Sequence, residues 1–163
     1  MRWVAVVGTR RPSPAAVRLT RDVVRELARA GFGIVTGGAR GIDYYAEHYA
    51  KLFKAPLRVV RPSDPTRRSS YVERDRKIAE VADAVVVIEA RSGTARFACC
   101  GTQYTVDAAV SLGKPPYIFK PLVGDELVQR AFNILVGRGA IVVSSIDDLM
   151  QRLRSPKQGV VGP

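Results

Sequence analysis

A glycine-rich turn that carries one arginine and one aspartate is the segment of this chain best suited to chemistry. Residues 34–43 read Ile-Val-Thr-Gly-Gly-Ala-Arg-Gly-Ile-Asp, so that an apolar strand runs into the turn and a helix follows. Such a turn presents backbone N–H groups and the positive end of a helix, and both favour anions. We therefore expect phosphate here, with Asp43 capping the helix or fixing the loop. The residues assigned to phosphate or nucleotide binding at this turn are Gly37, Gly38, Arg40, Gly41 and Asp43.

Three other short segments have related chemistry. Residues 8–11 read Gly-Thr-Arg-Arg, in which the glycine permits a tight turn and the arginines can fork onto phosphate oxygens. Residues 92–94 read Ser-Gly-Thr, and a Gly-Thr pair at 101–102 precedes another helical segment. Together with the first turn they predict one phosphate-binding crevice. The further residues assigned to it are Gly8, Thr9, Arg10, Arg11, Ser92, Gly93, Thr94, Gly101 and Thr102.

The standard nucleotide, metal and nucleophile motifs are missing from the sequence. No glycine loop is followed by Lys-Ser or Lys-Thr, and the first turn lacks Gly-x-Gly-x-x-Gly, which argues against ordinary NAD binding. The single histidine, His48, has no second nitrogen or thiol at a metal-ligand spacing, and Ser69 and Ser70 have no histidine partner. We therefore predict no cofactor, no metal site and no catalytic residue.

The elements that must position these loops alternate along the chain. Several strands, such as 84–88, are continuously apolar, which is typical of a parallel sheet covered on both faces. In the first helix Val17, Val24, Leu27 and Ala28 share the expected buried face. We predict an α/β fold with one doubly wound, mostly parallel, Rossmann-like sheet over residues 1–154 and a flexible tail at 155–163. The predicted strands are 3–8, 33–36, 57–60, 84–89, 117–120 and 140–143, and the predicted helices are 15–30, 42–53, 72–81, 103–112, 125–136 and 146–154.

The charge of the chain is strongly positive and uneven. Its 163 residues hold 26 basic and 15 acidic side chains, and residues 1–80 carry most of the net charge of +11. This distribution favours a surface that attracts phosphates, although an arginine-rich solvated surface is the alternative. The apolar runs are too short to span a membrane, and Met1 leads directly into a strand without room for a signal peptide. We expect a cytoplasmic protein.

Four segments of the chain resemble the Rossmann-like domain of the DNA-processing protein A family (DprA/Smf), within the superfamily that it shares with the LOG phosphoribohydrolases. They are residues 7–10 (Val-Gly-Thr-Arg), 36–43 (Thr-Gly-Gly-Ala-Arg-Gly-Ile-Asp), 74–79 and 87–94. The resemblance implies binding of single-stranded DNA on a basic surface and a homodimer. It also implies that Arg10, Arg40, Arg74 and Arg76 contact phosphates.

Two departures from these families bear on function. Residues 74–76 read Arg-Asp-Arg where DprA proteins usually have Arg-Asn-Arg, so an amide is replaced by a carboxylate that would repel phosphate if it faced the groove. Residues 100–105 are similar to the helix start of the LOG enzymes, but Thr105 stands where those enzymes have their glutamate, and a hydroxyl cannot stabilise an oxocarbenium-like centre as a carboxylate can. We predict a non-catalytic, DprA-like protein that binds single-stranded DNA or a mononucleotide. The alternatives are a LOG-like nucleoside monophosphate phosphoribohydrolase and a nucleotide-sensing or carrier module.

Four aromatic residues could stack on bases, as single-strand binders require. They are Tyr44, Tyr45, Tyr71 and Phe97. For each of them, packing in the core is the alternative role that the sequence favours.

Overall fold

Six short strands form one sheet in which every neighbouring pair is parallel, in the order β3-β2-β1-β4-β5-β6. The structure is a computed structural model that describes residues 2–93 and 100–155. The strands are β1 (Trp3–Val7), β2 (Gly33–Thr36), β3 (Leu57–Val59), β4 (Ala84–Val87), β5 (Pro116–Phe119) and β6 (Ile141–Val143), and the helices are α1 (Pro14–Arg29), α2 (Ile42–Leu52), α3 (Arg68–Val81), α4 (Thr102–Ser111), α5 (Glu126–Gly137) and α6 (Ile146–Arg154). This confirms the predicted Rossmann-like α/β fold.

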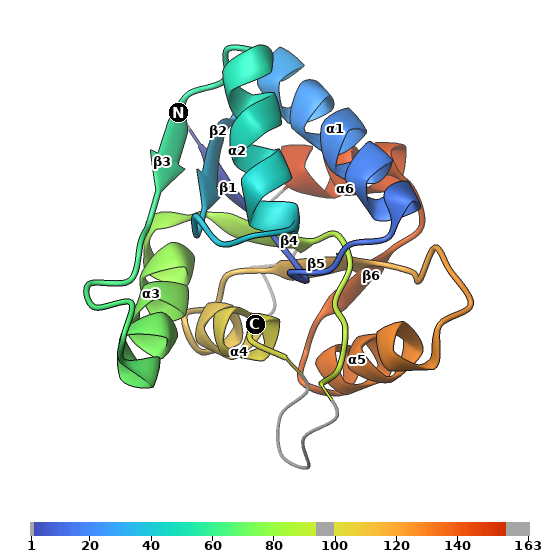
Figure 1. The fold of residues 1–163 in the computed structure, drawn as a ribbon. Coiled ribbons are helices and arrows are strands. Elements are labelled where there is room, and N and C mark those ends of the chain that lie inside the picture. The colour runs from blue at the N-terminus through green and yellow to red at the C-terminus, as the bar shows by residue number, and fades with distance from the viewer. Residues whose placement is uncertain (1, 94–99, 156–163) are drawn as a thin grey trace.

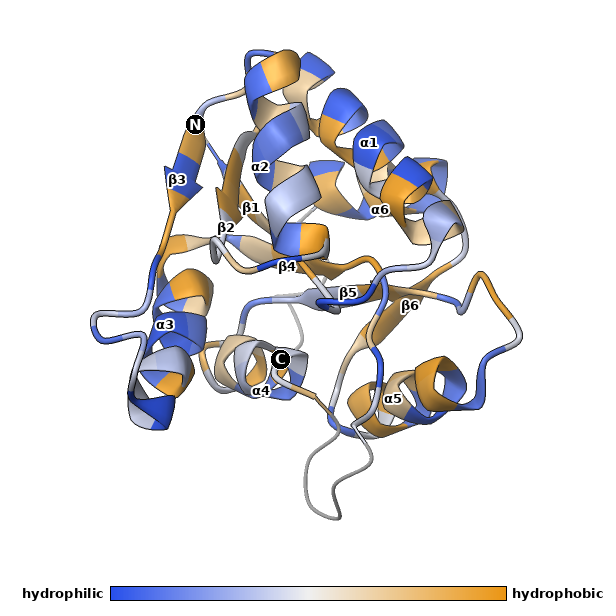
Figure 2. Cartoon of the chain, in the orientation of Figure 1, coloured by the Kyte–Doolittle hydropathy of each residue, from blue (hydrophilic) through white to orange (hydrophobic). Residues whose placement is uncertain are grey.

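The helices cover both faces of the sheet. Helices α1, α2 and α6 lie on one face, and α3, α4 and α5 lie on the other (Figure 1). Successive residues of a strand point to opposite faces, so Val4 and Val6 pack toward the first layer whereas Ala5 and Val7 pack toward the second. Apolar residues of the helices accordingly gather toward the sheet (Figure 2). Because both faces are buried, the central strands are apolar throughout.

The order of the strands determines where a ligand can approach. The chain starts at β1 in the middle, moves outward to β3 on one side, and returns to β4 on the other side of β1. The strand order therefore reverses between β1 and β4, and the loops that follow these two strands diverge at the carboxyl edge of the sheet. In open α/β sheets this is the usual position of a ligand crevice.

Two details of the predicted helices were wrong. Helix α3 begins at Arg68 and not at residue 72, because its first turn is polar and its N-cap residue, Arg67, has no side-chain capping bond that would signal a start. In α1 the buried face is rotated, so Val17 and Ala28 are only partly buried while Ala16 and Thr20 are buried. Thr20 can lie inside because its hydroxyl donates to the carbonyl of Ala16 at 2.8 Å.

The fold does not test two of the predictions, the flexible C-terminal tail and the cytoplasmic location. Of the predicted tail, residues 156–163 lie outside the described residues, so the division at residue 154 stays a prediction. None of the helices in the described ranges has the length and apolarity needed to cross a bilayer. The cytoplasmic location stays a prediction.

Candidate functional site

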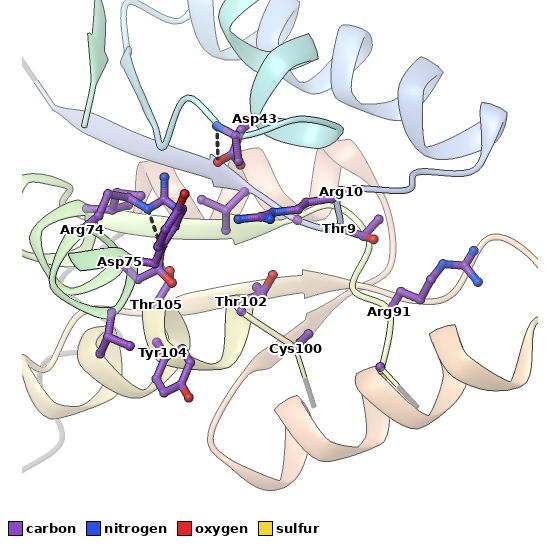
Figure 3. Close-up of a pocket in the computed structure, with 18 of the residues that line it drawn as sticks. Thr9, Arg10, Asp43, Arg74, Asp75, Arg91, Cys100, Thr102, Tyr104 and Thr105 are labelled. Carbon is purple, nitrogen blue, oxygen red and sulfur yellow. Dashed lines mark hydrogen bonds and ion pairs between the residues drawn. The ribbon is translucent and has the colours of Figure 1, made fainter. Parts of the chain in front are cut away.

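A cleft of about 880 Å³ opens at the carboxyl edge of the sheet, beside the switch point between β1 and β4. Its walls are the loops after these strands, one side of α3 and the first turn of α4, as Figure 3 shows. We call it the main cleft. Of the residues predicted to bind phosphate, the structure brings these to its lining: Gly8, Thr9, Arg10, Arg11, Asp43, Arg74, Ser92, Gly93, Gly101 and Thr102.

The other predicted residues lie elsewhere. Arg76 is exposed on α3 outside the main cleft, because a residue two positions after Arg74 on a helix faces the opposite side. Arg40 and Gly41 line a second hollow, which lies between the first turns of α1 and α2. Gly37 and Gly38 line neither hollow, and Thr94 lies outside the described residues.

Arg74 is built into the wall of the main cleft. Its side chain is buried, its Nε donates to Oδ1 of Asp75 at 2.8 Å, and its Nη1 donates to the main-chain oxygen of Gly37. A Cβ added to Gly37 would lie 2.9 Å from Arg74 Nη1 and 2.7 Å from Oδ2 of Asp43, so glycine is needed for this close approach. The main contacts of Arg74 are therefore with the protein, and they join α3 to the turn after β2.

Two carboxyl groups flank this arginine. Burial raises the pKa of Asp43 to about 6, although Arg74 and the N–H of Ala39 act in the opposite direction. That N–H donates to Asp43 at 3.4 Å, in agreement with the predicted loop-fixing role. Burial also raises the pKa of Asp75, against the charge and hydrogen bond of Arg74 and the charge of Arg10. The carboxylate of Asp75 is thus held by Arg74.

The excess positive charge of the main cleft comes from three exposed arginines, Arg10, Arg11 and Arg68. In the described part of the chain, none of the three forms an ion pair with a carboxylate within 4.0 Å. The guanidinium of Arg10 lies 5.6 Å from the centre of the Tyr71 ring, a cation–π contact that orients it across the cleft. These groups can form charge-assisted hydrogen bonds with phosphate oxygens.

Arg68 is a site residue that the sequence analysis did not assign, and Tyr71 was named there only as a possible stacking residue. The start of α3 at Arg68 places both on its first turn, beside the cleft. The Tyr71 hydroxyl donates to the carbonyl of Pro65 at 2.9 Å, and Arg74 also lies 5.6 Å from its ring centre. Tyr71 is therefore a support for two arginines and not a core residue. If the start of α3 had been predicted correctly at Arg68, both residues would have been placed on its first turn, beside the cleft.

The loop after β4 is fixed from two sides. Glu89 is buried and accepts hydrogen bonds from the N–H and the hydroxyl of Ser13, at 2.8 and 2.7 Å. Ser13 also caps α1 through Ala16, so Glu89 anchors the start of this helix and does not line the main cleft. On the other side, the Ser92 N–H donates to the carbonyl of Leu127 at 3.0 Å. The Ser92 hydroxyl lines the cleft, buried and without a partner in the described ranges.

Helix α4 contributes hydroxyl groups and no carboxylate to the cleft. Thr102 and Thr105 are buried and line it. Asp107, two residues further, does not line the cleft and forms an ion pair with Arg138, the C-cap residue that follows α5, with distances of 2.7 and 2.8 Å. The carboxylate of Asp107 is therefore directed away from the position of Thr105.

A second hollow, of about 680 Å³, lies between the first turns of α1 and α2. Arg10 lines both this hollow and the main cleft. Tyr44 and Tyr45 also line it, and Tyr44 is 58% exposed, so the expectation that Tyr44 packs in the core was wrong. Phe97, the fourth aromatic candidate, lies outside the described residues. The complete lining of this second hollow is Arg10, Pro12, Pro14, Val17, Arg18, Arg40, Gly41, Tyr44 and Tyr45.

Comparisons with known proteins agree with this architecture. Residues 1–56 match the family model of DNA recombination-mediator protein A. Among solved structures, DNA processing protein A from Helicobacter pylori is similar with a TM-score of 0.77 and 21% identity, over 95% of this chain and 81% of that one. The protein from Streptococcus pneumoniae has a TM-score of 0.76 and 22% identity, over 92% of this chain but only 61% of its own.

A different protein matches over nearly its whole length. The molybdenum cofactor carrier protein from Chlamydomonas reinhardtii has a TM-score of 0.70 and 17% identity, over 98% of this chain and 99% of that one. At such identities the likeness of the structures shows the fold. No curated protein sequence matches the chain.

Proposed function

We propose that this chain, a DprA-like Rossmann domain by its N-terminal sequence match and its fold, binds single-stranded DNA without catalysis. The proposal rests mainly on three arginines, Arg10, Arg11 and Arg68, that line the same cleft. Among the described residues, none of these three side chains forms an ion pair with a carboxylate. The phosphate backbone is the part of a nucleic acid that such groups recognise regardless of sequence. The glycine turns leave room for the backbone to approach.

The relatives support this choice of ligand. The Helicobacter pylori protein is described by its single-stranded DNA binding mode. In our proposal the phosphates bind at Arg10, Arg11 and Arg68, with the Ser92 hydroxyl and the first turn of α4 as further donors. Arg74 takes part indirectly, because it holds the Gly37 turn and Asp75 in place.

A second candidate function is the carriage or sensing of one nucleotide-like molecule. The volume of the main cleft falls within the range of small-molecule sites, and the carrier protein of Chlamydomonas reinhardtii matches this chain from end to end. The two functions differ in how affinity depends on ligand length. A carrier site is filled by one nucleotide, whereas a DNA site gains contacts as the strand lengthens.

The test is a titration of fluorescein-labelled oligo(dT) at several salt concentrations, followed by fluorescence anisotropy. For wild type we expect the logarithm of the affinity to fall with that of salt, with a slope of about −0.7 per neutralised phosphate. Arg10→Ala should weaken binding and reduce the slope by about one contact. Arg130→Ala, an exposed arginine of α5 that lines neither hollow, is the matched control and should change neither value. Binding that is equal and insensitive to salt in all three proteins would reject the proposal.

The homodimer that the family resemblance implies is part of the same proposal. A dimer could align two main clefts along one strand. Sedimentation velocity with and without oligo(dT) measures the oligomeric state directly, and a monomer under both conditions would reject this part alone.

A further inference from the structure

The main cleft and the second hollow are neighbours that share Arg10 as a common wall. The loops after β1 and β2 are tied together at this point, because the Ile42 N–H donates to the carbonyl of Thr9 at 3.0 Å. This contact holds Arg40, on one loop, near Arg10 on the other. The two hollows therefore lie on either side of a fixed pair of loops at the same edge of the sheet.

The second hollow has the chemistry of a nucleotide site. Three arginines line it, Arg10, Arg18 and Arg40, and no carboxylate is part of its described lining. Neither Arg18 nor Arg40 has a carboxylate within 4.0 Å among the described residues. The remaining lining is apolar or aromatic. A ligand with negative charge on one side and flat rings on the other would complement the arginines and the aromatic residues of this hollow.

Tyr44 presents an aromatic ring in a defined orientation at the rim. Its ring meets that of Tyr45 edge to face, with centres 5.2 Å apart and planes at 84°. On the same helix, His48 lies almost parallel to it, with an angle of 8° and a centre-to-centre distance of 6.4 Å. The ring is nevertheless 58% exposed. Aromatic rings of this kind serve as stacking platforms in proteins that bind single strands, because every base has a flat face.

We infer that the second hollow binds the nucleotide that continues a DNA strand out of the main cleft. Its phosphate lies between Arg10 and Arg40, and its base stacks on Tyr44. The inference rests on the proposed function, because the strand is held in the main cleft first. It extends that function by a second subsite in which the base of the adjoining nucleotide is recognised by stacking.

The occupant follows from charge and position. A positively charged hollow with no carboxylate in its described lining disfavours a basic partner, and its continuity with the main cleft through Arg10 favours a ligand that extends between the two. A single strand combines regularly spaced negative charges with flat bases. A free mononucleotide held in the main cleft has no second nucleotide to place against Tyr44.

The experiment compares two oligo(dT) strands, one of about 4 and one of about 12 nucleotides, at the ends of the usual site-size range. We expect Tyr44→Ala to lose about tenfold in affinity for the longer strand, in line with the loss of one stacked base, and less than about twofold for the shorter one. Tyr44→Phe should restore the affinity, because stacking needs the ring and not the hydroxyl. Leu52→Ala is the matched control, since Leu52 is on the same helix, is 59% exposed and lines neither hollow.

A covalent readout complements the affinities. A longer strand that carries 5-iodouracil should form a photocrosslink to Tyr44, identified by peptide mapping. The inference is overturned if Tyr44→Ala binds both strands as wild type does, or if Leu52→Ala loses as much affinity as Tyr44→Ala. Either result leaves the proposed function intact when wild type still binds in a salt-dependent way. If wild type binds neither strand, the proposed function and this inference are both rejected.

Discussion

The α-carbon of Gly41 packs directly against the backbone of Arg10. A Cβ added to Gly41 would lie 2.6 Å from the Arg10 Cα and 2.3 Å from the carbonyl oxygen of Thr9. Gly41 also has a φ of +78°, a conformation that other residues adopt only with strain. The contact joins the loops after β1 and β2, and it therefore fixes the position of Arg10 between the two hollows.

Gly41→Ala is expected to destabilise the protein and to displace Arg10. The positive φ alone costs an alanine about 1–2 kcal/mol, and the backbone contacts must add to it, for a total loss of about 3 kcal/mol or more. Urea unfolding measures the free energy of unfolding. In buffer without urea, and at a low temperature at which the variant is still folded, its affinity for oligo(dT) should also fall.

Gly113→Ala is the control for this prediction. Gly113 has a φ of +69°, but no atom lies within 4 Å of where its Cβ would be. It should lose only the conformational cost of about 1–2 kcal/mol and keep its affinity for DNA. Equal destabilisation of the two variants would show that the contact with the Arg10 loop contributes nothing.

The contribution of Asp43 to the stability of the protein should fall as pH rises from about 4 to about 6. Burial raises the pKa of Asp43 from 3.8 to about 6 in the folded state, so in this interval the folded protein binds more protons than the unfolded chain. The stabilisation is complete below the unfolded pKa and is lost as pH rises through the folded one. Asp43→Asn removes this titration, so its stability relative to wild type should increase by about 3 kcal/mol across the window. Urea unfolding at pH 4 and pH 7 provides the measurement.

Asp125 offers a control of opposite sign. Its pKa is lowered, first by the hydrogen bond from Arg91 and then by the N–H of Leu127. The stability it contributes is present above the unfolded pKa and is lost as pH falls. Asp125→Asn should therefore lose stability relative to wild type as pH rises, the reverse of Asp43→Asn. Parallel curves for wild type and Asp43→Asn would mean that the raised pKa of Asp43 does not exist.

The wild-type protein is expected not to release free base from nucleoside monophosphates. Cleavage of the N-glycosidic bond places positive charge on the sugar, and α4 presents Thr105 to the cleft where a carboxylate would be required. Loss of one such electrostatic contact costs about 10²- to 10³-fold in rate. Chromatography of a panel of monophosphates after incubation with the purified protein measures the release.

Asp75→Asn is the variant to test if the wild-type protein does release free base. Asp75 lines the cleft, and its carboxylate is held by Arg74 at 2.8 Å. Hydrolysis by wild type that disappears in this variant would identify Asp75 as a catalytic carboxylate and would favour the phosphoribohydrolase alternative. Thr105→Glu is a second comparison, although its larger side chain must fit a buried position.

The sequence alone determined the class of fold and the positions of most elements. Hydrophobic runs and helical periodicity are local properties, so β2 and α6 were predicted with their observed bounds, and most other ends differ by one or two residues. The glycine turns were also recognisable locally, because a tight turn before a helix requires particular residue types. Where the local signal was weak, as in the polar first turn of α3, the helix start was missed, and Arg68 was not assigned to the site.

Only the tertiary structure decided which charges line the two hollows. The sequence presents Arg74, Arg76, Arg10 and Arg40 as equivalent cations. Packing of α3 against the sheet and α4 buries Arg74 against Asp75 and Gly37 and leaves Arg76 exposed outside the cleft. The order of the strands places Arg10 at the switch point, and the contact of its loop with Gly41 puts Arg40 on the second hollow. These outcomes depend on contacts between residues far apart in the chain, which no local pattern of residue types encodes.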